Sequence, residues 1–296
     1  MKSKIFYPLV AKNLSNRDIF AGIKTLKTGN ITMGERTKKL ETIFKNKITK
    51  RESIMVNSGS SANLLIFQCL INPKVQLLNN GDEVLIPAIC WSTSLWPIIQ
   101  SGLKPIFVDV DKNTLNICID DLSRKITKKT KALMLVHVLG NSADMSKIVK
   151  LCKKNRLVLI EDACEALGSK YKDKQLGTFG DFSSFSMFYS HHITSGEGGI
   201  VSVKNKKYSN IIKLLRSHGW SRETGKTKDA WEFVNSGFNL RPTDVSASIG
   251  INQLSRLEKI LNTRKFNYNL LFKLFTKHKK FSNQFSIIKD GKFVNA

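Results

Sequence analysis

The sequence has 296 residues, of which 41% are hydrophobic and 24% are charged. This length and apolar content suit one large domain, or one large and one small domain, and no apolar run reaches the ~20 residues that span a bilayer. The formal net charge is +25, but the lysines are scattered and no zinc-finger, RRM or KH signature is present. We therefore expect a cytoplasmic protein that binds neither membrane nor nucleic acid, and whose positive surface favours a small anionic substrate.

From residue 61 onward, patterns typical of helices alternate with apolar runs typical of strands. The predicted helices cover 61–71, 94–102, 119–127 and 143–156, and the predicted strands cover 82–88, 104–111, 131–140 and 157–163. Continuous apolar strands separated by helices predict βαβ units and an α/β fold, in which a mostly parallel sheet has helices on both faces.

The second half of the chain predicts a different series of elements. A hairpin is expected over 168–181, and two further strands flank the loop 186–199. The pattern is then helical from Thr243 to Phe275, and residues 285–294 begin a strand or hairpin.

The five cysteines lie far apart and form no C-x-x-C pair. An odd number at such spacings argues against a disulfide framework, and against a zinc or iron–sulfur site built from cysteines. We expect reduced, buried thiols and no bound metal.

Small residues precede the first predicted helix in the motif NSGSSANLL, residues 57–65. Gly59 and Ser60 let backbone N–H groups and a hydroxyl approach an anion at the positive end of that helix. An ordinary serine N-cap explains the same residues. The motif alone does not choose between an anion site and a cap.

Two residues with chemical potential follow predicted strands. Asp162 ends the strand in LVLIEDACEALGS, and Trp91 follows another strand in ICWSTSLWP. Ligand sites of open parallel sheets lie at this edge, where a buried carboxylate needs a cation. The pyridinium nitrogen of pyridoxal phosphate is one such cation, and a tryptophan ring can stack on a flat cofactor. The alternatives are a helix-capping aspartate and a core tryptophan.

The loop SMFYSHHITSGEGG, residues 186–199, carries two adjacent histidines, while no lysine lies between Asp181 and Val203. Ser186 is suited to donate to a phosphate, and a histidine is suited to act as a general base near neutral pH. Only one base is needed, so the second histidine is expected to pack. His137, within a predicted strand, is expected to be a core residue.

In this order, the motifs resemble the DegT/DnrJ/EryC1/StrS family of sugar aminotransferases. The resemblance runs from LKTGNITMGERTKKLE through VNSGSSANLL, GDEVLIPAICWSTSLWPIIQSGLKPIFVDVD, LIEDACEALGS, LGTFGDFSSFSMF and ITSGEGGIV to SGFNLRPTDVSASIGINQL. It implies the fold-type I architecture of pyridoxal phosphate enzymes (aspartate aminotransferase-like) and a homodimer with active sites at the subunit interface.

The loop departs from the family pattern at one decisive position. Ordinary members have a lysine in S-x-K-N-[IL]-[ST]-x-G-E-G-G, which forms the Schiff base with the cofactor, whereas this sequence has His191 there and His192 in place of the asparagine. A branch with this change consists of nucleotide-sugar 3-dehydratases, which hold pyridoxamine phosphate non-covalently. The segment 221–233 contains no cysteine, so the chain resembles branch members without an iron–sulfur cluster, which act on GDP-4-keto-6-deoxy-D-mannose.

The resemblance implies removal of the C3 hydroxyl of a nucleotide-linked 4-keto-6-deoxyhexose, with His191 as the base and L-glutamate as amine donor. The implied cofactor contacts are Gly59, Ser60, Trp91, Asp162, Glu165, Ser186 and Asn239. The implied substrate contacts are Gly29, Asn30, Ile31, Thr32, His218, Arg222 and Arg241. Among these, Asn239 and Arg241 are expected to reach the site of a neighbouring subunit.

Family members continue beyond the length of this chain. We therefore expect a large cofactor-binding domain with an N-terminal arm over 1–245, followed by a long helix and the start of an incomplete small domain over 246–296. Two other functions stay open: an amino-sugar transaminase whose lysine comes from elsewhere, and an inactive remnant that binds cofactor or sugar. The sequence does not decide the nucleotide or the hexose.

Overall fold

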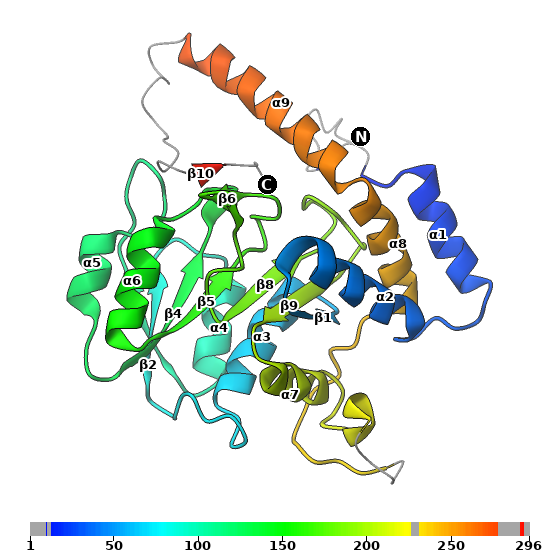
Figure 1. The fold of residues 1–296 in the computed structure, drawn as a ribbon, viewed down its shortest axis with the longest axis horizontal. Helices are drawn as coiled ribbons and strands as arrows, with labels where there is room; N and C mark the ends of the chain where they lie inside the picture. Colours follow the sequence, from blue (N-terminus) through cyan, green and yellow to red (C-terminus); the bar gives the residue numbers. More distant parts are fainter. Residues whose placement is uncertain (1–9, 11–12, 226–230, 278–290, 293–296) are drawn as a thin grey trace, which may run out of the picture.

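The structure, a computed structural model, describes residues 10, 13–225, 231–277 and 291–292. A seven-stranded sheet in the order β1-β9-β8-β5-β4-β2-β3 forms its centre (Figure 1). The strands are β1 (Glu52–Val56), β2 (Glu83–Pro87), β3 (Lys104–Val108), β4 (Thr130–Val136), β5 (Val158–Asp162), β8 (Phe182–Ser186) and β9 (Gly199–Val203). The strands from β8 to β3 run parallel, and β9 is antiparallel to both β8 and β1. The predicted mostly parallel sheet is confirmed.

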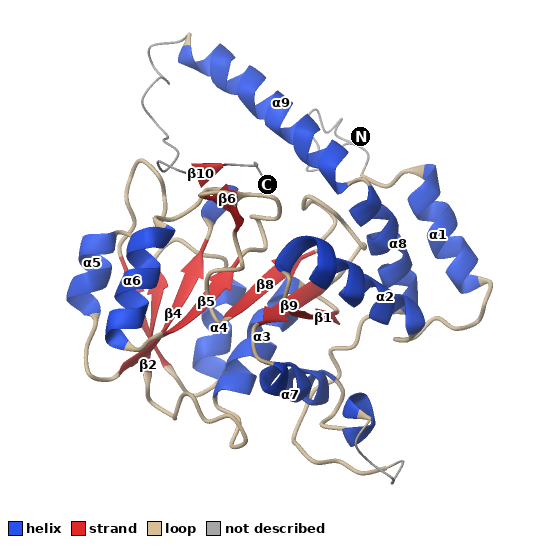
Figure 2. Ribbon diagram, viewed as in Figure 1, coloured by secondary structure: helices blue, strands red, loops and turns tan. Residues whose placement is uncertain are grey.

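Helices cover both faces of the sheet (Figure 2). One hydrophobic core lies beneath α3 (Gly59–Leu70), α4 (Ser92–Gln100) and α7 (Lys206–Arg216). The other lies beneath α2 (Glu35–Phe44), α5 (Ile119–Lys125), α6 (Met145–Asn155) and α8 (Asp244–Ser255). A sheet buried on both faces explains why its central strands read as continuous apolar runs.

Helix α6 shows how the local sequence sets an element. Asp144 accepts a hydrogen bond from the N–H of Lys147 (3.2 Å) and so caps the N-terminus. Ile148 and Cys152 are buried one turn apart, and Arg156 ends the helix in a left-handed conformation with φ 55°. The predicted bounds of 143–156 differ from the observed helix only at its ends.

The remaining elements lie around this centre. They are α1 (Asn16–Leu26), a π-helix (Lys45–Thr49), two 3₁₀ turns (Val138–Gly140 and Ser221–Thr224), α9 (Leu257–Thr276), and the short strands β6 (Lys170–Tyr171), β7 (Lys174–Gln175) and β10 (Gly291–Lys292). The predicted hairpin over 168–181 is confirmed by β6 and β7. Of the strand predicted over 285–294, only β10 lies within the described residues.

The long helical pattern from Thr243 onward is divided into α8 and α9. The division falls at Arg256, whose guanidinium pairs with the buried carboxylate of Asp18 in α1 (2.5 Å). Helix α1 packs along α8, while α9 projects past the edge of the sheet (Figure 1). An ion pair to a distant helix, which no local pattern reveals, marks the break.

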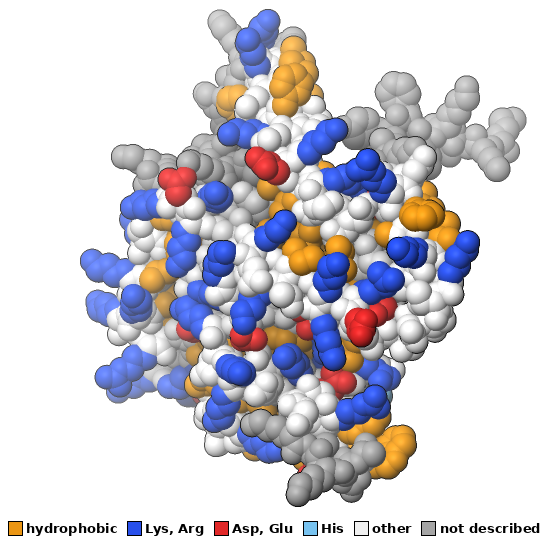
Figure 3. All heavy atoms as spheres, turned by 45° about the vertical axis from the view of Figure 1, so that its right-hand side comes forward, with side chains coloured by type: hydrophobic (Ala, Val, Ile, Leu, Met, Phe, Trp, Pro, Cys, Tyr) orange, Lys and Arg blue, Asp and Glu red, His pale blue; other side chains and the backbone are white. Residues whose placement is uncertain are grey.

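Lysine and arginine side chains are spread over the face drawn in Figure 3 rather than gathered in one block. In the described part of the chain, no helix combines the length and apolar character that crossing a membrane requires.

Candidate active site

Asp162 lies at the carboxyl edge of the sheet, where β5 ends between β4 and β8. Its carboxylate is 6% exposed and is held by three donors. Asn63 Nδ2 (2.9 Å) and Ser94 Oγ (2.8 Å) donate to Oδ2, and the N–H of Cys164 donates to Oδ1 (3.1 Å). The residues after Asp162 form turns, so the helix-capping alternative is wrong. A carboxylate has about four acceptor positions, so the described residues leave one for an outside donor.

Gly59 begins α3 and lies against Ser186, the last residue of β8. A Cβ atom on Gly59 would lie 2.8 Å from the Cβ of Ser186 and 2.9 Å from the Sγ of Cys164, so a larger residue would push these elements apart. Ser58 caps α3 by accepting from the N–H of Ser61 (3.0 Å). The cap interpretation therefore holds for Ser58, while Gly59 brings the positive helix end next to β8.

Helix α4 begins beside α3. The hydroxyl oxygens of Ser60 and Thr93 lie 2.8 Å apart, and Asn63 Nδ2 donates to the carbonyl of Thr93 (3.2 Å). Trp91 is the residue before α4, and 74% of it is exposed, so the core alternative is wrong for this tryptophan. An exposed indole at this edge is available to stack on a flat ring.

Glu165 follows Asp162 in the same loop and accepts a hydrogen bond from the N–H of Leu139 (2.8 Å). Burial raises the pKa of Glu165, the hydrogen bond from Leu139 opposes this effect, and the nearby charge of Asp162 raises the pKa further. A second carboxyl group near Asp162 is therefore easier to protonate than an ordinary glutamate.

His191 lies in the loop between β8 and β9. Its ring packs edge-on against Phe188, with the ring centroids 5.9 Å apart. Burial lowers the pKa of His191, the carboxylate of Asp162 opposes this, and the charge of Arg264 lowers the pKa further. Arg264, from α9, donates to the carbonyls of Ser190 (3.3 Å) and His191 (3.4 Å). The imidazole is therefore neutral at neutral pH and can accept a proton.

The two histidines that were predicted to pack in the interior are buried. His192 and His137 are each 1% exposed, as expected of residues that belong to the interior. His137 follows β4, and its ring contacts Glu161. Within the described ranges, no group of three or more His, Cys, Asp or Glu side chains is placed to hold a metal ion.

A second set of the predicted residues lies in a separate cleft of about 880 Å³ beside α2 and α7. Thr32, Arg222, Asn239 and Arg241 line this cleft, and none of the residues around Asp162 does. Arg241 Nε donates to Asn239 Oδ1 (3.1 Å), and its Nη2 lies 3.4 Å from His218 Nε2. The two predicted groups are therefore not brought together within one chain.

The segment from Gly29 to Thr32 forms the turn between α1 and α2. The carbonyl of Ile31 accepts from the N–H of Asp244 (3.0 Å), and Thr32 pairs with Thr243 in an isolated bridge. Thr32 lines the cleft, whereas Gly29, Asn30 and Ile31 do not. The segment is thus held against the start of α8.

Residues 13–290 match the DegT/DnrJ/EryC1/StrS aminotransferase family. The chain belongs to this family. It is 37% identical over 289 residues to the GDP-4-keto-6-deoxy-D-mannose 3-dehydratase of Yersinia pseudotuberculosis, which covers 94% of this chain and 74% of that relative.

Solved structures of this kind of family member have the same fold. The E. coli GDP-4-keto-6-deoxy-D-mannose-3-dehydratase with bound hydrated PLP superposes with a TM-score of 0.89 at 36% identity, over 92% of this chain and 73% of that one. A GDP-4-keto-6-deoxymannose-3-dehydratase with a trapped PLP–glutamate geminal diamine gives 0.88 at 36% identity, over 92% and 74%. The predicted fold-type I architecture is confirmed.

Three residues beside Asp162 were missed by the sequence-based reasoning: Asn63, Ser94 and Cys164. Asn63 follows Gly59 by one helical turn, and Ser94 lies three residues after Trp91, so both sit in motifs already singled out. What the motifs do not show is that α3 and α4 begin side by side next to the end of β5. The signal that could have found Asn63 and Ser94 is a polar residue about one turn inside each of the helices α3 and α4.

Proposed function

We propose that this chain is a nucleotide-sugar 3-dehydratase that uses pyridoxamine and pyridoxal phosphate. It removes the C3 hydroxyl of a nucleotide-linked 4-keto-6-deoxyhexose, and L-glutamate restores the amine form of the cofactor. The observation that carries the proposal is His191, which occupies the loop position where aminotransferases of the family have lysine. The similarity to GDP-4-keto-6-deoxy-D-mannose 3-dehydratases supports GDP as the nucleotide.

The residues at the sheet edge fit the cofactor. Asp162 has an acceptor position left on a carboxylate that Asn63 and Ser94 already orient, which suits a protonated pyridine nitrogen. The close approach of Gly59 to Ser186 places a helix N-terminus and a hydroxyl together, which suits a phosphate. We propose that these residues, with Ser60, Trp91 and Glu165, hold the cofactor.

Bound there, the cofactor supplies an electron sink next to its amine carbon. The residues of the chain supply the rest. Asp162 keeps the ring nitrogen protonated, because a paired carboxylate favours the cation. His191 takes a proton from the amine carbon, since its lowered pKa leaves the imidazole neutral, and it cannot tie up the cofactor as a lysine would. We propose that the C3 hydroxyl then leaves as water, in place of amino transfer, with the proton that His191 took and with electrons drawn from the cofactor.

We propose a homodimer in which the second group serves the partner's site. Thr32, Arg222, Asn239 and Arg241 line a cleft apart from Asp162, with three cationic or amide groups that suit anionic oxygens. We extend this role to Gly29, Asn30, Ile31 and His218. In this proposal Asn239 contacts the partner's cofactor, and all the other residues of the group contact the nucleotide sugar. The proposal also includes a large domain over 1–245, a small domain that begins in 246–296, and a cytoplasmic location.

The reaction is tested with purified protein, PLP, L-glutamate and a panel of GDP-, CDP- and dTDP-linked 4-keto-6-deoxyhexoses. Mass spectrometry is expected to find a keto sugar that has lost one oxygen atom, together with equal amounts of 2-oxoglutarate and ammonia. An aminated sugar would instead identify a transaminase. No formation of 2-oxoglutarate would indicate a chain that binds the cofactor without turning over.

The biological setting follows from the product. A 3,6-dideoxyhexose linked to a nucleotide is a donor for cell-surface polysaccharide, and a relative from Salmonella typhimurium is named a lipopolysaccharide biosynthesis protein. We propose that the chain serves the synthesis of lipopolysaccharide O-antigen sugars.

A further inference from the structure

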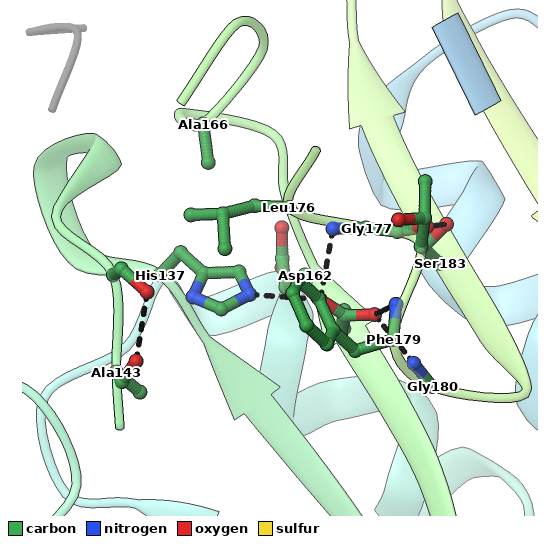
Figure 4. Close-up of polar contacts among 12 residues, drawn as sticks. His137, Ala143, Asp162, Ala166, Leu176, Gly177, Phe179, Gly180 and Ser183 are labelled. Carbon is green, nitrogen blue, oxygen red and sulfur yellow. Dashed lines mark hydrogen bonds and ion pairs between the residues drawn. The ribbon is translucent and has the colours of Figure 1, made fainter. Parts of the chain in front are cut away.

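Glu161 is a buried acid that the proposed mechanism does not use. It precedes Asp162 in β5, and because side chains alternate along a strand, the two carboxylates point to opposite faces of the sheet. The side chain of Glu161 is fully buried, and Nε2 of His137 lies 3.1 Å from its Oε2. Figure 4 shows the ring of His137, which follows β4.

Three backbone N–H groups complete the surroundings of this carboxylate. Gly177 (2.8 Å) donates to Oε2, and Phe179 (2.7 Å) and Gly180 (2.6 Å) donate to Oε1 (Figure 4). Burial alone would raise the pKa of Glu161, but the hydrogen bonds from His137 and the two glycines outweigh it, and the pKa is lowered. An ionised carboxylate only accepts hydrogen bonds, so the contact fits the His137 tautomer in which Nε2 is the donor.

The same pair is joined to the backbone of Asp162. The N–H of His137 donates to the carbonyl of Asp162 (3.2 Å), while its ring is held by Glu161, the preceding residue. His137 therefore binds two consecutive residues at the end of β5, the side chain of Glu161 through its ring and the carbonyl of Asp162 through its N–H. A shift of either partner would move the peptide that carries the Asp162 side chain.

The His137–Glu161 pair is also linked by hydrogen bonds to β8. Ser183, which lies opposite Glu161 in the β5–β8 register, donates to the carbonyl of Gly177 (2.7 Å), the residue whose N–H binds Glu161. Strand β8 continues to Ser186, beside Gly59. One buried carboxylate is thus linked through Gly177 to Ser183, which belongs to the strand that ends in Ser186.

We propose that His137 and Glu161 are positioning residues, which set the Asp162 carboxylate for the ring nitrogen of the cofactor. This inference rests on the cofactor site of the proposed function. It differs from a role in stability alone, because it requires that loss of the pair weakens cofactor binding in molecules that are still folded.

Arg51 offers a matched control. It donates to the carbonyls of Gly180 (2.8 Å) and Thr178, so it fixes the same turn that Glu161 binds. Its hydrogen bonds go to these two carbonyls, the residue is half-buried, and its positive charge lies near Glu161. Arg51→Lys keeps the positive charge near Glu161 but cannot bind both carbonyls as the planar guanidinium does, so it should lower stability while leaving every hydrogen bond of His137 and Glu161 in place.

The experiment measures the dissociation constant and the absorbance band of PLP bound to the whole chain, with the thermal midpoint of each variant. His137→Phe and Glu161→Gln are expected to weaken PLP binding by about tenfold, the lower end of what supporting partners of metal ligands contribute. Both should shift the absorbance band, which reports the protonation of the ring. Arg51→Lys should leave the PLP dissociation constant and the absorbance band unchanged at a comparable loss of thermal midpoint.

Unchanged PLP affinity and absorbance in folded His137→Phe would overturn the inference, as would equal losses of affinity in Arg51→Lys. If His137→Phe yields no folded protein, Glu161→Gln carries the same comparison, and unchanged PLP affinity in that variant would overturn the inference. Asp162→Asn separates the two proposals. If it binds PLP as the unaltered chain does, the cofactor site itself is wrong; if it weakens binding and the pair variants do not, only the positioning role fails.

Discussion

The start of α2 depends on a single distant carboxylate. Its N-cap residue, Gly34, has no side chain to accept a hydrogen bond. Asp244, the first residue of α8 and 4% exposed, takes that place. It accepts from the N–H groups of Gly34 (2.9 Å), Arg36 (3.0 Å) and Thr37 (2.9 Å), and from the Thr37 hydroxyl (2.8 Å).

Asp244→Ala leaves these four donors without their acceptor. At about 1 kcal/mol of net stability for each hydrogen bond, the loss is about 4 kcal/mol. The neighbouring Thr243 is a matched control, because it is exposed and caps α8 by accepting a single bond, from the N–H of Ser246 (3.1 Å). Thr243→Ala should cost about 1 kcal/mol.

Urea unfolding of the cofactor-free chain, followed by circular dichroism, measures both losses. The midpoint should fall several times further for Asp244→Ala than for Thr243→Ala, with little change in the dependence of the unfolding free energy on urea. Similar losses in the two variants would refute the reasoning, since they would mean that water replaces Asp244 at the end of α2. Asp244→Asn, which keeps one oxygen acceptor, should fall between them.

Three further predictions concern charge and the cofactor. His191→Lys should abolish dehydration and allow borohydride to couple the cofactor covalently to the chain, whereas the unaltered chain should lose its cofactor on denaturation after the same treatment. Arg264→Gln should raise the pKa of His191, because it removes a positive charge that lowers it, as measured by proton NMR of the imidazole. The pKa of Asp18 is lowered below 3.8, since hydrogen bonds from Ser15 and Asn252 and the charge of Arg256 outweigh the effect of burial. Asp18 therefore contributes stability that is complete above pH 3.8 and is lost as the pH falls through its folded pKa, and Asp18→Asn should weaken this acid dependence in urea titrations.

Each of these has a clear opposing result. A cofactor removed from borohydride-treated His191→Lys would place residue 191 away from the cofactor. An unaltered imidazole titration in Arg264→Gln would mean that burial alone lowers the pKa of His191. Equal acid sensitivity of Asp18→Asn and the unaltered chain would show that the carboxylate is ionised equally in the folded and unfolded states.

Several parts of the candidate site could be predicted because they are local. Asp162 ends a continuous apolar run, Trp91 follows another, and Gly59 begins a helical pattern, so each was placed at an element boundary from neighbouring residues alone. Parallel strands with helices between them bring such boundaries to one edge of the sheet. The replacement of lysine by His191 was likewise visible in the sequence, since it needs only the flanking motif.

Other parts depended on contacts between residues far apart in the chain. Asn63 and Ser94 meet Asp162 from helices 99 and 68 positions away. The antiparallel strand β9 lies between β8 and β1, although β1 precedes it by more than a hundred residues. Such pairings follow from the packing of the whole sheet, which local periodicity does not encode.

The sequence by itself determined the α/β class, the edge at which Asp162 lies, and the histidine in place of lysine. These follow from the two-residue and 3.6-residue periods of apolar side chains and from one motif. Only the tertiary structure decided that Asn239 and Arg241 lie in a cleft apart from Asp162, and that His137 contacts Glu161, the residue before Asp162. The physical reason is that a buried charge must find its donors wherever the folded chain brings them, whatever their distance along the sequence.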